Sequence, residues 1–172
     1  MNHEFDQEGA RRSDFYALLL VEMRALLAAS EGASPDLVWL SHLANAAALL
    51  FERLPLANWV GFYLTHGKSL YVGPFQGRVA CSRIPFGKGV CGLAASTRQP
   101  QLVRDVHEFP GHISCDARSR SELVIPLVSE GKVLGVLDLD SPVLGRFSQS
   151  DLLGLQPIAE LISGVIPVGP GL

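Results

Sequence analysis

Three cysteines, Cys81, Cys91 and Cys115, lie in the middle of this chain of 172 residues. An odd number of cysteines cannot all be paired within one chain, and the N-terminal residues lack the apolar core of a secretion signal. We therefore expect no structural disulfide framework and a cytoplasmic location, where thiols stay reduced unless they are used. The pattern favours redox chemistry in which a disulfide is transient.

Three acidic residues, Glu122, Asp138 and Asp140, follow the cysteines on two apolar segments that read as strands. Because Asp138 and Asp140 are two positions apart, they share one face of a strand at a separation of about 7 Å. A hairpin across Gly131 would bring Glu122 beside them. Clustered carboxylates repel one another, so at least one is expected to keep its proton near neutral pH and to act as a general acid. The others can bind a cation such as an ammonium group.

A plainer interpretation of these acids stays open. The second strand would end at Leu137, and both aspartates would lie in a solvated turn beside Ser141 and Pro142. Glu122 would then be an exposed residue at the start of its own strand. In that arrangement the carboxylates would carry no special chemistry.

Cys115 lies in a polar segment, residues 107–121, that reads as a long loop, and such loops are often functional. The neighbouring side chains of His112 and Arg118 can carry positive charge, which favours the nucleophilic thiolate. A single cysteine in a loop is otherwise often inert. The loop therefore makes Cys115 a candidate nucleophile whose case depends on its companions.

Cys81 falls in a segment, residues 77–84, that we expect to form a third strand. Cys91 falls at the start of a short glycine-rich helix, where the helix dipole would lower the pKa of its thiol. Either cysteine could instead be a small buried hydrophobic residue, which is the usual place of a free cysteine.

A metal site is a competing use of these residues. The three cysteines are separated by nine and twenty-three residues, which lacks the close pairs of structural zinc sites. His112 and Cys115 could still supply two ligands, with His107 nearby. We expect no bound metal, and a zinc-stabilised interaction module remains an alternative.

Trp59 and Tyr63 flank Gly61 on one face of a predicted strand. Two aromatic rings on either side of a glycine can form the wall of a small-ligand pocket. Ordinary core packing would explain the same pattern.

The order of elements predicts an α+β fold in which a central antiparallel sheet has helices packed on one side. We expect a flexible N-terminal tail over residues 1–12, one domain over residues 13–166 and a C-terminal tail over residues 167–172. The net charge of −3 gives no electrostatic basis for binding nucleic acid, and no apolar stretch is long enough to cross a membrane.

Four stretches of the chain resemble the free methionine-R-sulfoxide reductases, which are single GAF-domain enzymes. The stretches are NWVGFYL, GPFQGRVACSRIPFGKGVCGLAA, HISCDARSRSELVIPL and GVLDLDS, and the similarity runs from about Trp39 to Ile162. The resemblance implies reduction of the R epimer of free methionine sulfoxide, with electrons from thioredoxin, no bound cofactor and a homodimeric assembly. A GAF domain that senses a small molecule without turnover is the alternative.

The resemblance also implies roles for individual residues. Cys115 would attack the substrate, Cys81 would resolve the product as a disulfide, and Cys91 would be a third cysteine of less certain role. The acids and aromatic residues of the substrate pocket would be Glu122, Asp138, Asp140, Trp59 and Tyr63.

Overall fold

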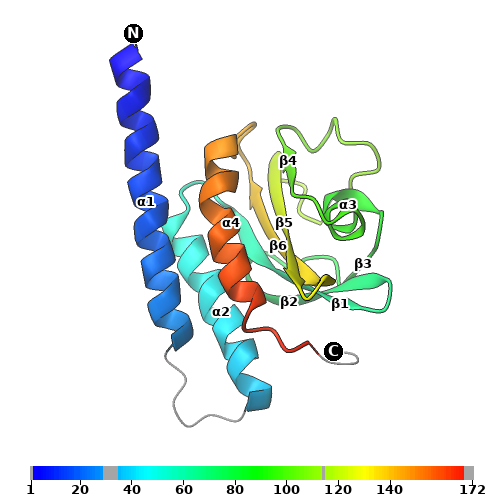
Figure 1. Cartoon of the computed structure of the whole chain (residues 1–172). Coiled ribbons are helices and arrows are strands. Elements are labelled where there is room, and N and C mark those ends of the chain that lie inside the picture. Colours follow the sequence, from blue (N-terminus) through cyan, green and yellow to red (C-terminus); the bar gives the residue numbers. More distant parts are fainter. Residues whose placement is uncertain (1, 29–34, 114, 169–172) are drawn as a thin grey trace.

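One six-stranded antiparallel sheet, with the strand order β3-β2-β1-β6-β5-β4, forms the centre of the protein (Figure 1). The computed structural model describes residues 2–28, 35–113 and 115–168. The strands are β1 (Trp59–His66), β2 (Ser69–Gly77), β3 (Arg83–Pro85), β4 (Gln101–Val103), β5 (Ser121–Ser129) and β6 (Lys132–Ser141). The helices are α1 (Asn2–Ala28), α2 (Pro35–Arg53), α3 (Gly89–Thr97) and α4 (Gln149–Ser163).

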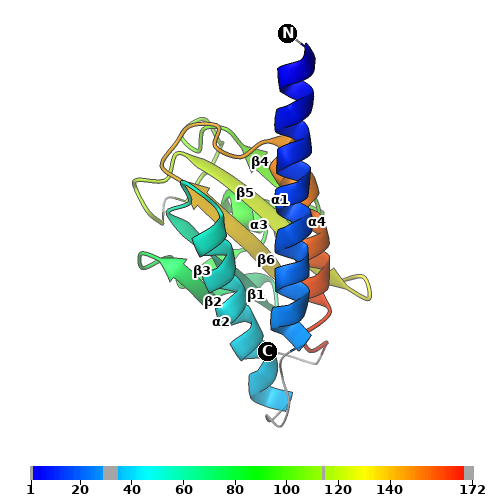
Figure 2. The same ribbon diagram turned by 90° about the vertical axis from the view of Figure 1, so that its left-hand side faces the viewer.

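The three long helices cover one face of the sheet, and α3 lies on the other face (Figures 1 and 2). The strands bury side chains on both faces of the sheet, so the described residues form two apolar clusters. Along β1, Val60 and Phe62 join the helix-side core, whereas Trp59 and Tyr63 pack on the side of α3. The alternation that the sequence predicted for this strand is confirmed, and so is the α+β class.

The pairing of β6 with both of its neighbours fixes the positions of the acidic residues. Asp140 lies opposite Glu122 of β5 and opposite Trp59 of β1, and Asp138 lies opposite Gly61. The hairpin between β5 and β6 turns at residues 130–131, both of which have positive φ, as a tight two-residue turn requires. Because β6 continues to Ser141, the interpretation in which the strand ends before the aspartates is wrong.

Two predicted boundaries need correction. The first helix begins at Asn2, whereas the sequence indicated a loose tail up to residue 12. Apolar periodicity starts only near Ser13, but no proline precedes it, so the helix can extend without an apolar face. The division of the chain at residues 12 and 166 stays a prediction, and residues 169–172 of the expected tail lie outside the described residues.

The segment around Cys81 is the second correction. β2 continues to Gly77 in register with β1, and β3 begins only at Arg83. Residues 78–82 therefore connect two strands, and Cys81 lies in a connection, not in the strand that we predicted over residues 77–84. Side-chain alternation alone does not reveal this, because it cannot tell where the paired length of a hairpin ends.

Gly61 allows β1, β2 and an aromatic ring to approach closely. A Cβ atom on Gly61 would lie 2.3 Å from the Cβ of Phe75 and 2.7 Å from the Trp59 ring. We expect Gly61→Ala to lower the free energy of unfolding by about 1–3 kcal/mol, because β2 and the Trp59 ring must both move. Denaturant unfolding measures this change. The control Gly164→Ala, at a helical φ of −70°, should shift the unfolding free energy by less than about 1 kcal/mol. Equal effects of the two substitutions would contradict the prediction.

Candidate active site

A pocket on the α3 side of the sheet brings together most of the residues that the sequence singled out. β1, β5, β6, α3 and the loop before β5 all contribute to its wall. The expected residues that line it are Trp59, Tyr63, Cys91, Cys115, Glu122, Asp138 and Asp140. Cys81 does not line the pocket, but its sulfur is bonded to that of Cys115. The free space left in the pocket is about 30 Å³.

The three acids are held against one another away from water. Glu122 is 5% exposed and Asp138 is 6% exposed, and Asp140 is partly exposed. Burial, and then the charges of the two aspartates, raise the pKa of Glu122 well above its ordinary value. Burial also raises the pKa of Asp138 to about 6 and that of Asp140 well above its usual range. The prediction that at least one acid keeps its proton near neutral pH is therefore supported by the geometry.

One oxygen of this cluster has no hydrogen-bond partner. Asp138 Oδ1 is buried and accepts no hydrogen bond from the residues that the structure describes. A buried carboxylate oxygen without a partner is costly unless a donor or a cation reaches it. The pocket is thus suited to a ligand with a positively charged or hydrogen-bond-donating group.

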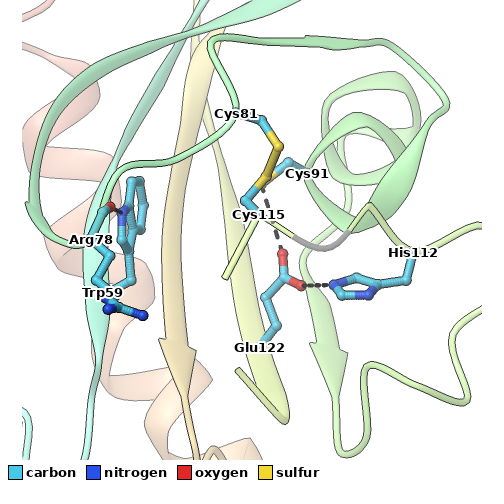
Figure 3. Close-up of a disulfide and its surroundings, with 7 residues drawn as sticks. All are labelled: Trp59, Arg78, Cys81, Cys91, His112, Cys115 and Glu122. Atoms are coloured by element: carbon cyan, nitrogen blue, oxygen red, sulfur yellow. Dashed lines mark hydrogen bonds and ion pairs between the residues drawn. A yellow bond between two sulfur atoms is a disulfide. The ribbon is translucent and has the colours of Figure 1, made fainter. Parts of the chain in front are cut away.

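Cys91 is a buried thiol beside the acids. Its side chain lies in α3, and its Sγ is 3.8 Å from Glu122 Oε1 (Figure 3). Burial and the charges of Asp138 and Glu122 raise the pKa of this thiol well above its ordinary value. Our expectation that the helix dipole lowers this pKa is wrong, because the loss of hydration and the nearby acids outweigh the dipole.

His112 contacts the other oxygen of Glu122. Its Nε2 is 3.9 Å from Glu122 Oε2 (Figure 3), and the ring lines the pocket. Burial, and then the charge of His107, lower the pKa of His112, so the ring is neutral at neutral pH. The His112 ring therefore does not supply the positive charge that we expected to favour the thiolate of Cys115.

Cys81 and Cys115 form a disulfide whose Cα atoms are 5.4 Å apart (Figure 3). The link joins the connection between β2 and β3 to the loop that precedes β5. Cys91 is the free cysteine; it is buried and lines the pocket. The three cysteines are therefore close in space, and the pair in the disulfide is the one that the resemblance implied.

Asn58, which precedes β1, and Trp59, the first residue of β1, anchor the two segments that carry the disulfide cysteines. Asn58 Nδ2 donates to Asp116 Oδ2 (3.3 Å) and to Ser119 Oγ (3.2 Å) in the segment that follows Cys115. Trp59 Nε1 donates to the carbonyl oxygen of Arg78 (3.0 Å), three residues before Cys81. Sequence reasoning missed the role of Asn58, and its position next to Trp59 was the only signal.

The aromatic wall of the pocket is a stack of three rings. Trp59 stacks on Tyr63 with ring centroids 5.8 Å apart, and on Phe75 at 5.2 Å. Burial, and then the charge of Asp138, raise the pKa of the Tyr63 hydroxyl. The wall predicted from Trp59 and Tyr63 does line the pocket, and Phe75 of β2 supports it from behind.

The zinc ligands weighed from the sequence are not brought together. Cys115 is in the disulfide, and His107 pairs with Asp105 at 2.9 Å on the surface. Within residues 2–28, 35–113 and 115–168, the only cluster with metal-ligand spacing is Cys91, Glu122 and Asp138. None of the described helices is long and apolar enough to span a membrane.

Comparison with known proteins agrees with this geometry. The model of the GAF domain family matches residues 40–166. Over 155 residues, 90% of each protein, the chain is 47% identical to the free methionine-R-sulfoxide reductase of Escherichia coli K12. The chain belongs to the GAF-domain family of free methionine-R-sulfoxide reductases. The resemblance that the sequence indicated is confirmed.

Other members of this family are similar over most of their length. The free methionine-R-sulfoxide reductase of Saccharomyces cerevisiae is 45% identical over 150 residues, which cover 82% of this chain and 83% of that protein. The X-ray structure of the free methionine-R-sulfoxide reductase of Neisseria meningitidis, in complex with its substrate, has a TM-score of 0.82 and 40% identity. The match covers 90% of this chain and 89% of that one.

The buried acids predict how stability depends on pH. A carboxyl group whose folded pKa is raised destabilises the folded state progressively as the pH rises above its ordinary pKa, 4.5 for Glu122. We expect Glu122→Gln to gain stability relative to the parent between pH 4.5 and pH 8, by about 1–3 kcal/mol at the upper end. Urea unfolding at several pH values measures the difference. The control is Glu160→Gln, on the exposed side of α4. Its free energy of unfolding should differ from that of the parent by the same amount at every pH. A pH-independent difference for Glu122→Gln would contradict the prediction.

Proposed function

We propose that the protein is an oxidoreductase that reduces free L-methionine-R-sulfoxide to L-methionine, with Cys115 as the nucleophile and Cys81 as the resolving cysteine. The observation that carries the proposal is the Cys81–Cys115 disulfide beside three clustered acids in one pocket, two of which are buried. The named activity of the family members supports the choice of substrate.

The acid cluster supplies the proton that the reaction needs. A sulfoxide oxygen leaves sulfur only when it is protonated, and a carboxylic acid with a raised pKa is a suitable donor near neutral pH. Glu122 is well placed because its pKa is raised and it lies beside Cys91 at the base of the pocket. In the first step the Cys115 thiolate attacks the sulfur of the protonated sulfoxide and forms an S–S bond with it. The oxygen then passes to the Cys115 sulfur as this S–S bond breaks, so that methionine leaves with the electron pair and Cys115 is left as a sulfenic acid.

The second step uses Cys81. Its thiol attacks the sulfur of the sulfenic acid, a water molecule leaves, and the disulfide forms. The two electrons that the cysteines have given to the methionine sulfur are restored when an external dithiol reduces this disulfide. We propose thioredoxin as the external dithiol, with no bound cofactor, and a cytoplasmic homodimer as the working form. Cys91 contributes through its contact with Glu122 and stays outside the disulfide.

The remaining acids account for selection of the free amino acid. Asp138 has an unpartnered buried oxygen, and Asp140 lies next to it on the same strand face. An α-ammonium group of the substrate would fit between them as a cation, whereas a methionine within a peptide chain has no such charge. Trp59 and Tyr63 would pack against the S-methyl end, where contacts between sulfur and aromatic rings are favourable.

The state of the cysteines sets the order of events. In the disulfide form Cys115 is bonded to Cys81 and has no thiolate with which to attack a sulfoxide. The disulfide is therefore reduced before the Cys115 thiolate attacks the substrate.

The proposal is tested by the choice of substrate. Methionine production is measured with four compounds, the free R and S sulfoxides and the same two epimers within a peptide, with dithiothreitol as reductant. We expect turnover of the free R epimer alone. Binding of free methionine sulfoxide without any methionine formed would instead favour a GAF sensor, and turnover of the peptide-bound sulfoxide would contradict the role given to Asp138 and Asp140.

The assignment of the nucleophile is tested by matched serine substitutions. We expect Cys115→Ser to lose activity by about a thousandfold or more, because a serine hydroxyl is not ionised at neutral pH and cannot replace the thiolate. We expect Cys91→Ser to keep measurable turnover and to form the disulfide after one turnover. Methionine formed and thiols consumed, both followed by mass spectrometry, measure these outcomes. Full activity in Cys115→Ser, or no disulfide in Cys91→Ser, would contradict the assignment.

A further inference from the structure

A second hollow adjoins the disulfide at Cys115, and none of Glu122, Asp138 and Asp140 lines it. It runs between residues 77–79, which precede Cys81, and residues 115–118, which begin with Cys115. We call this hollow the outer groove. It shares Val79, Cys115 and Asp116 with the substrate pocket, and the two cysteines of the disulfide are both partly exposed.

Access to the disulfide favours the outer groove. A protein that reduces the disulfide must bring a thiolate into contact with one of its sulfur atoms. The pocket side leaves little room for such a group, because its cavity volume is only about 30 Å³. The outer groove is roomier, with a volume of about 560 Å³, and Cys115 lines it.

Both sides of the outer groove are held in place in the disulfide form. Trp59 fixes the carbonyl oxygen of Arg78 on one side. On the other side Asn58 donates to Asp116, whose carboxylate is also bound by Arg118 at 2.8 Å. A surface whose segments are already fixed loses less conformational entropy when a partner binds. The outer groove is therefore suited to protein recognition.

The side chains around the outer groove define the chemistry of its partner. Val79 is 88% exposed, the highest value among the large apolar side chains of the described residues. Two exposed cationic side chains, those of Arg78 and Arg118, flank it, although the whole chain carries a net charge of −3. A partner with an apolar surface around its reactive thiol and a carboxylate at the rim would complement this arrangement.

We infer that the outer groove is the docking surface for a dithiol protein that reduces the Cys81–Cys115 disulfide. The inference rests on the proposed function and adds the site of the partner to it. The partner's thiolate attacks one sulfur of the disulfide, the S–S bond breaks, and the other cysteine leaves as a thiolate that takes up a proton. The partner's second thiol then attacks the mixed disulfide. The enzyme is released with two thiols, and the partner leaves as a disulfide, two electrons having been transferred.

The test compares a protein reductant with a small one. Val79→Asp places a charge at the apolar centre of the outer groove, and Arg78→Glu reverses a charge at its rim. With thioredoxin as the probe, we expect both variants to lower the rate of disulfide reduction by about tenfold, as loss of one good interface contact would. Reduction by dithiothreitol should stay within about twofold of the parent, because a small dithiol needs no docking surface.

Val128→Asp is the matched control, since Val128 is an exposed valine near the β5–β6 hairpin. It should change neither rate. Equal rates for Val79→Asp and the parent with thioredoxin would overturn the inference, and so would an equal loss with both reductants. A change in the molar mass of Val79→Asp in solution would overturn it too, because the outer groove would then bind a second copy of the chain.

The reduction step is followed directly, by the rate at which the disulfide of the purified protein disappears, and no sulfoxide is present. Failure of the docking inference is therefore separable from failure of the proposed function. If dithiothreitol supports no methionine production, the proposed function fails, while the comparison of the two reductants still decides the docking site.

Discussion

The burial of three carboxyl groups against one another is the constraint on which the rest of the site depends. Antiparallel pairing sets Asp140 opposite Glu122, and the two-residue strand period sets Asp138 on the same face. Three charges cannot be kept together out of water without large cost, so the cluster retains protons or receives a cation. The acid cluster can therefore donate a proton to a sulfoxide oxygen, and it can also bind an ammonium group.

The segments that carry the disulfide are held around this cluster by Asn58, which precedes β1, and by Trp59, the first residue of β1. Asn58 and Trp59 bind, respectively, the segment after Cys115 and the segment before Cys81. These bonds hold the disulfide over the acids although both of its cysteines lie outside helices and strands. Cys91, in contrast, is held by α3 and is kept as a thiol by burial. Position in the fold thus gives chemically identical side chains different roles.

Much of the site could be predicted from local sequence because strand geometry is regular. The alternation in β1 and β6 correctly placed the aromatic wall and the two aspartates, and the short turn at Gly131 correctly brought Glu122 to them. Prediction failed where local pattern does not decide the outcome. The segment of Cys81 was misassigned because the pairing of β2 with β1 sets where the strand ends, and the pKa of Cys91 depends on acids thirty or more residues away.

The sequence by itself determined the fold class, the family, and the set of residues that share each strand face, since side-chain alternation and motif similarity are written in the order of residues. Only the tertiary structure decided which cysteine is buried beside Glu122 and which two meet as a disulfide. It also decided that Asn58 anchors the loop and that an outer groove opens beside Val79. These features depend on contacts between segments distant in sequence, whose distances and solvent exposure exist only once the chain has folded.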